Sequence, residues 1–143
     1  MARMGWQRDH RGEGWLALSG LLGAGLALPL ARGAWHGPEF AATLAVSAIA
    51  LLAGQRWAIA AIVIAELCLL PTVWPRAVLE PGGISRLIAF ATLTAIVPGM
   101  LAMPRAAVAL VGMTGHGATE RRCRRMHLGL VALGVFAVLV PLF

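Results

Sequence analysis

The sequence predicts an all-α, polytopic integral membrane protein, and three observations support this fold class. Hydrophobic residues occupy 59% of the 143 positions, and the mean hydropathy is +0.81. Charged residues account for 13%, well below the share of about 25% in soluble domains. The apolar residues also fall into separate long runs. Such a chain cannot cover a globular surface with polar groups, so we expect one transmembrane helical domain over residues 1–143.

About five transmembrane helices are expected, because a membrane span needs about 17–25 mainly apolar residues. The predicted spans cover residues 15–31, 40–54, 57–74, 87–103 and 128–143. Only Gln55 and Arg56 separate the short second span from the third. A tight turn after Gly54 is favoured there, because one continuous helix would bury Arg56 and exceed the bilayer thickness. A span of about 17 residues reaches about 26 Å, so these helices are short for a hydrocarbon core of about 30 Å.

The arginines predict the orientation of the chain. All twelve basic residues are arginine. With a cytoplasmic N-terminus, nine of them lie inside and three, Arg32, Arg76 and Arg86, lie outside. This distribution satisfies the positive-inside rule and favours an odd number of spans with an external C-terminus. It also argues against nucleic acid as a partner, because the arginines are spread between apolar runs instead of forming one basic face.

The first span leaves an alternative open. Arg3, Arg8 and Arg11 precede an apolar run and then small residues near 31–34. This order resembles a secretory signal peptide, whose cleavage would leave four spans. The apolar run is slightly long for a signal peptide, so a retained span is favoured.

Residues 104–127 are predicted to form an arginine-rich cytoplasmic loop. Residues 104–113 are apolar apart from Arg105, so this part is expected to lie along the membrane surface or to extend the fourth span. Four arginines follow within five residues: Arg121, Arg122, Arg124 and Arg125. They are predicted to contact anionic lipid headgroups. A docking site for an acidic partner or a phosphate-bearing ligand is the alternative.

Glu66 is the most informative candidate site residue, because it lies near the middle of the third span. A charge there costs about 2.5–3.5 kcal/mol on insertion scales, so we expect a neutral carboxyl unless an arginine reaches it. Thr92 and Thr94 are further polar candidates in the fourth span. Three interpretations are open for Glu66: a proton or cation site, a polar contact with another subunit, or a hydrogen bond across a helix interface.

Prolines and small residues predict where the spans bend and pack. Pro29 and Pro71 lie close to predicted span ends, whereas Pro98 is expected to kink the fourth span. Small residues recur every four positions along the first span: Ser19, Gly23, Ala27 and Ala31. This spacing either marks a packing seam or reflects the abundance of small residues in the chain.

Signatures of cofactors and catalysis are sparse in the sequence. The histidines lie in tails, in loops or at a span edge: His10, His36, His116 and His127. A membrane-buried haem with two axial histidines is therefore not expected, and lipid is the expected non-protein ligand. The sequence holds no Walker A loop, nucleophile elbow or H-E-x-x-H pair, so no catalytic or metal-binding residue is predicted. A membrane enzyme that holds a phosphate-bearing lipid at the arginine-rich segment is the weakest hypothesis.

The favoured function is that of a small, non-catalytic subunit or accessory protein of a larger membrane complex, whether respiratory, photosynthetic, secretory or transport. The alternative is a small oligomeric proton-coupled transporter or half-transporter that uses Glu66. Expected partners are membrane lipids and either other membrane subunits or further copies of the chain. Abundant alanine, glycine and arginine without lysine or asparagine is typical of a GC-rich bacterial genome, and so indicates the inner membrane of a bacterium.

Overall fold

The computed structural model describes residues 3–31, 36–115 and 119–143. Within these residues every regular element is a helix, which confirms the all-α fold class. The elements are α1 (Arg3–Ala31), α2 (Gly37–Leu52), α3 (Trp57–Leu79), α4 (Ile84–Leu101), α5 (Met103–Met113), α6 (Glu120–Leu139) and a closing 3-10 helix, η1 (Val140–Leu142). Residues 32–34, in the segment that resembles a cleavage site, lie outside the described residues.

Within the described residues, four helical segments are long and apolar enough to cross a membrane: Gly12–Leu30 of α1, α3, α4, and α6 together with η1. The apolar helices α2 and α5 are shorter. Large hydrophobic side chains such as Leu22, Ile49 and Leu87 are exposed on the outside of the bundle. Such exposure is expected where lipid, and not water, surrounds the protein. The chain is therefore a multi-pass membrane protein, as the sequence predicts.

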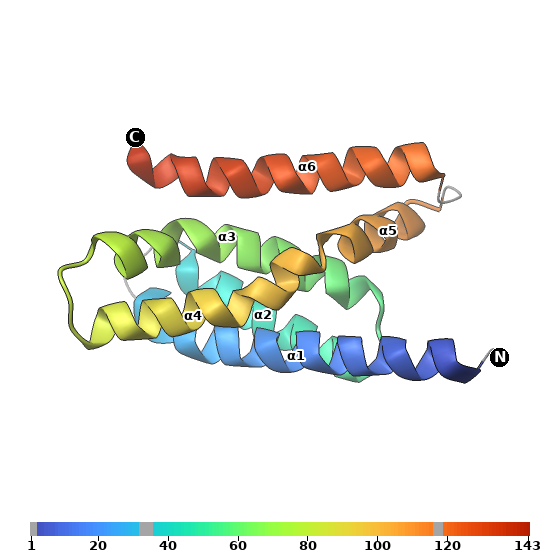
Figure 1. Cartoon of the computed structure of the whole chain (residues 1–143), viewed down its shortest axis with the longest axis horizontal. Helices are drawn as coiled ribbons and strands as arrows, with labels where there is room; N and C mark the ends of the chain where they lie inside the picture. Colours follow the sequence, from blue (N-terminus) through green and yellow to red (C-terminus); the bar gives the residue numbers. More distant parts are fainter. Residues whose placement is uncertain (1–2, 32–35, 116–118) are drawn as a thin grey trace.

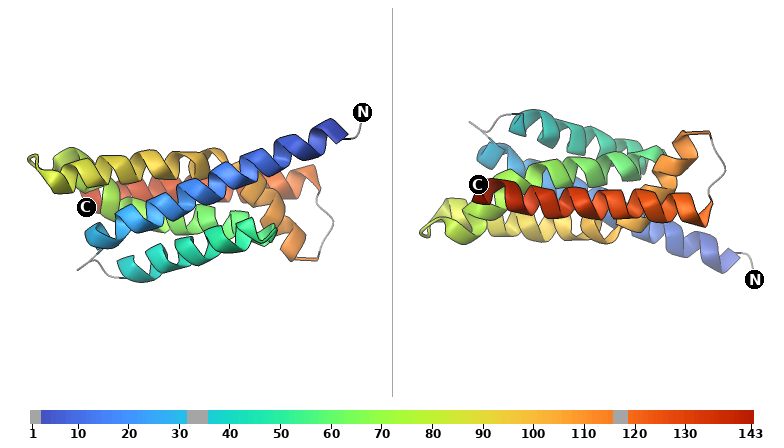
Figure 2. Two further views of the ribbon diagram at one scale, coloured as in Figure 1. Left: turned by 90° about the horizontal axis from the view of Figure 1, so that it is seen from below. Right: turned by 90° about the horizontal axis from the view of Figure 1, so that it is seen from above.

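The helices α1, α2, α3, α4 and α6 lie side by side, and in this order each runs opposite to the one before it (Figure 1). α3 occupies the centre, because it packs against each of the other helices. α1 packs mainly against α2 and α4, whereas α6 lies on the outside against α3 and α5. The first turns of α1 and the last residues of the chain lie at opposite ends of the bundle (Figures 1 and 2).

The prolines near two predicted span ends do not interrupt their helices. α1 continues through Pro29, and α3 continues through Pro71 and Pro75 as far as Leu79. Unwinding the main chain within a membrane would leave polar groups without partners, so the helix persists despite the missing N–H groups. α3 consequently extends five residues beyond the predicted span end at position 74.

The helical path breaks after α4, at Ala102. The Ala102 N–H donates to the carbonyl oxygens of Pro98 at 3.0 Å and Gly99 at 2.9 Å. α5 then begins at Met103, and Pro104 lies in its first turn, where proline loses no helical hydrogen bond. The segment 104–127, predicted to be a loop, thus consists mainly of α5 and the first turns of α6. α5 crosses the ends of the longer helices instead of running along them (Figure 2).

Glycine allows α1 to approach its neighbours closely. A Cβ placed on Gly20 would lie 3.3 Å from the Cβ of Ala48 in α2 and 3.9 Å from a methyl group of Ile62 in α3. A Cβ on Gly23 would lie 3.4 Å from a methyl group of Ile96 in α4. Ala27 of the predicted seam is also buried. Small residues therefore form much of the packing surface of α1, as is typical of helix association in lipid.

We predict that Gly20→Leu destabilises the bundle by about 1–3 kcal/mol, because the larger side chain forces α1 away from α2 and α3. Gly25→Leu is the matched control, since a Cβ at Gly25 meets no atom within 4 Å. The free energy of unfolding, measured by circular dichroism during denaturation in mixed micelles, should fall for the first variant alone. Equal stability of the two variants would contradict the packing described.

Candidate functional site

Glu66 lies near the middle of α3 and is 1% exposed. Hydrophobic residues of α3 surround it along the chain, and Ile62, Val63 and Leu67 are themselves fully buried. Neither carboxyl oxygen has a hydrogen-bond partner among the described residues. A buried polar group without a partner is rare in folded proteins and marks a position of strain or function.

The Glu66 carboxyl occupies space that Gly99 of α4 leaves open. A Cβ placed on Gly99 would overlap Oε2 and Cδ of Glu66 and would lie 2.8 Å from Oε1. Gly99 is buried and follows Pro98, whose missing N–H leaves one main-chain hydrogen bond of α4 unformed. α3 and α4 can therefore pack with an acidic side chain between them only because position 99 carries no side chain.

The two threonines predicted as polar candidates do not bond to Glu66. Thr92 is buried, and its hydroxyl donates to the carbonyl of Ile88 at 2.7 Å. Thr94 is exposed, and its hydroxyl donates to the carbonyl of Phe90 at 2.9 Å. Each hydroxyl thus satisfies a carbonyl of its own helix. A hydrogen bond from Glu66 across the helix interface, one of the three predicted roles, is not formed within the described residues.

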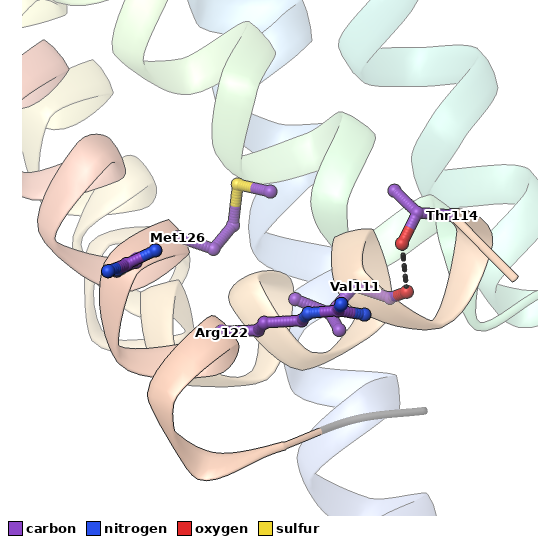
Figure 3. A pocket seen from close by; sticks show the side chains of 5 residues that line it. Val111, Thr114, Arg122 and Met126 are labelled. Carbon is purple, nitrogen blue, oxygen red and sulfur yellow. Dashed lines mark hydrogen bonds between the residues drawn. The ribbon is translucent and has the colours of Figure 1, made fainter. Parts of the chain in front are cut away.

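The four arginines of α6 are all exposed, and they divide into two pairs. Arg122 and Arg125 line an open, shallow cavity of about 490 Å³ between α5 and α6, together with Val111, Thr114 and Met126 (Figure 3). Arg121 and Arg124 are not among its lining residues. The division follows from the helical period, because residues three apart share a face.

Arginines from two other segments lie at the same end of the bundle. Arg56, in the turn before α3, and Arg105 of α5 line a second cavity of about 290 Å³, which Glu13 of α1 also borders. The Arg105 guanidinium lies across α1, where a Cβ on Gly12 would be 3.0 Å from Nη1. This end of the bundle, which we call the arginine end, therefore presents basic side chains from α5, α6 and the α2–α3 turn.

At the opposite end, arginines instead bind main-chain carbonyl groups. Arg76 donates to the carbonyl of Leu30 at the end of α1. Arg86 donates through Nε to the carbonyl of Ala77 at 3.2 Å, and its guanidinium lies 5.7 Å from the ring centre of Phe90. The last carbonyls of a helix lack partners within that helix, so these two arginines stabilise helix ends. The third predicted external arginine, Arg32, lies outside the described residues.

Histidine and cysteine side chains do not gather into a metal centre in the part of the chain that the structure describes. His127 is partly buried near the start of α6, and its Nδ1 is buried without a hydrogen-bond partner among the described residues. Cys68 and Cys123 are both free thiols. His116 lies outside the described residues.

Comparisons with known proteins yield no match. No protein-family model matches the sequence, and no curated protein or solved structure is similar enough to be matched. The functional interpretation therefore depends on the geometry of this chain.

We predict that Gly99→Ala lowers the free energy of unfolding by about 1–3 kcal/mol, because the added methyl group overlaps the Glu66 carboxyl. Gly129→Ala in α6 is the control, since a Cβ there meets nothing within 4 Å. In a double-mutant cycle, Glu66→Ala should offset part of the Gly99→Ala loss, with a coupling energy of about 0.5–3 kcal/mol. Additive losses would show that Glu66 and Gly99 are not in contact.

Proposed function

We propose that the chain is a non-catalytic integral membrane subunit that packs through α6 against a larger membrane complex. The observation that supports this role is the exposure of α6. Of its residues, only Leu130 and Ala137 are buried, whereas α3 is buried over most of its length. An apolar helix held on one side alone offers an extended surface for other transmembrane helices.

A groove beside α6 adds to this surface. It has a volume of about 350 Å³ and separates α6 from α4, with Leu67 and Leu70 of α3 at its base. α6 approaches α3 at Gly134, where a Cβ would lie 3.3 Å from a methyl group of Leu67. The remaining lining residues are apolar: Met100, Met103, Val131, Val135, Val138 and Leu139. Small and apolar residues of this kind are what helix packing in lipid uses.

The proposed topology has five crossings, with the arginine end in the cytoplasm and the C-terminus outside. Its support is the antiparallel succession of α1, α2, α3, α4 and α6 (Figure 1) and the positive-inside rule. The proposed location is the inner membrane of a bacterium.

A proton-coupled transporter that uses Glu66 stays the second hypothesis. Its support is the buried carboxyl without a partner. Ion-coupled sites assemble several polar groups at one depth, and the hydroxyls of Thr92 and Thr94 bond to their own helix instead. The accessory-subunit role is favoured over the transporter role for this reason.

A photo-crosslinking amino acid at position 136 tests the accessory role. Phe136 of α6 and Val46 of α2 are both 64% exposed, so position 46 serves as a matched control on a different helix. Irradiation of native membranes should join position 136, but not position 46, to a different integral membrane protein identified by mass spectrometry. Lipid adducts alone at both positions, or purification of the chain by itself in mild detergent, would contradict the proposal.

A further inference from the structure

We propose that the cavity between α5 and α6 binds the phosphate group of an anionic membrane phospholipid, held by Arg122 and Arg125. This site does not depend on the proposed accessory role. Five residues line it: Val111, Thr114, Arg122, Arg125 and Met126. None of the five is acidic, so a bound anion meets two guanidinium groups and no carboxylate on the walls of the cavity.

The two arginines carry the donor groups that phosphate recognition uses. They lie three residues apart and both line the side of α6 that faces α5. A guanidinium group donates two parallel N–H bonds to phosphate oxygens, which makes arginine the preferred partner of such groups. In Figure 3, Arg122 extends from α6 toward Val111 and Thr114 at the end of α5. Arg122 also belongs to the first turn of α6, where the helix dipole adds positive potential.

The Val111 carbonyl at the end of α5 is already engaged within its own segment. The carbonyl oxygen of Val111 already accepts the Thr114 hydroxyl at 2.7 Å and the Thr114 N–H at 3.2 Å. Glu120 is the acidic residue nearest in sequence; it is exposed and does not line the cavity. Neither guanidinium group donates to another residue in the described part of the chain, so both are available for an anion from outside the protein.

The depth of the cavity favours a lipid over a soluble anion. The apolar part of α6 begins at Leu128. At 1.5 Å per residue, Arg125 lies about 4.5 Å and Arg122 about 9 Å beyond that point along the helix. The headgroup layer extends about 5–7 Å on each side of the hydrocarbon core, so Arg125 lies within it and Arg122 lies about 2 Å beyond its outer edge. Val111 and Met126 provide an apolar wall for the glycerol and the first acyl carbons (Figure 3).

The test compares two double variants that remove the same charge. Arg122→Gln/Arg125→Gln alters the cavity, whereas Arg121→Gln/Arg124→Gln alters the exposed arginines that do not line it. Native mass spectrometry of the full chain in detergent measures retention of added phosphatidylglycerol against phosphatidylcholine. The wild type and the control should prefer phosphatidylglycerol, with affinities that agree within about threefold. The cavity variant should bind it about 10- to 30-fold more weakly, because two arginine contacts are lost.

Several outcomes would overturn the proposal. Equal weakening by the two double variants would indicate diffuse attraction to the arginine end and no defined site. Displacement of phosphatidylglycerol by inorganic phosphate at equal concentration would assign the cavity to a soluble anion. Displacement by a hexaglutamate peptide would assign it to an acidic protein partner. If circular dichroism shows that the double cavity variant is unfolded, the single variants Arg122→Gln and Arg125→Gln replace it, each with an expected loss of about three- to sixfold.

Discussion

The contact that holds α2 against α1 and α3 determines the arrangement of the rest of the chain. α2 has 16 residues and reaches about 24 Å, so its length alone does not make it a crossing. Its place depends on Gly20 of α1, which lets Leu44 and Ala48 approach the α1 main chain beside Ile62 of α3. Because α2 runs antiparallel to α1, α3 runs in the same direction as α1. α4 and α6 then continue the alternation of directions.

This alternation brings distant parts of the sequence to the same ends of the bundle. Arg56, Arg105 and Arg122 meet at the arginine end, where α5 and α6 leave a cavity between them. Arg76 and Arg86 lie at the other end and bind carbonyl groups of helix ends. Arginines at the two ends therefore differ in their surroundings: one group is exposed and lines cavities, and the other completes helix termini.

The sequence predicts features that depend on local pattern and misses those that depend on packing. Apolar runs identify the helices, and the central place of Glu66 in its span predicts that it is buried. The partnership of Glu66 with Gly99 is not predictable, because it requires the register between α3 and α4. Likewise, the separation of Arg122 and Arg125 from the other two arginines becomes visible only once the segment 104–127 is known to be helical.

Thiol labelling tests the five-crossing topology most directly. Cys123 lies in the first turn of α6, at the arginine end, and a cysteine introduced by Phe143→Cys lies at the C-terminus, at the opposite end. Cys68, within α3, is replaced by alanine to avoid background labelling. Our account predicts that a membrane-impermeant maleimide added to intact cells labels position 143, and labels Cys123 only after the membrane is permeabilised. Labelling of both positions from the same side would contradict the five-crossing arrangement.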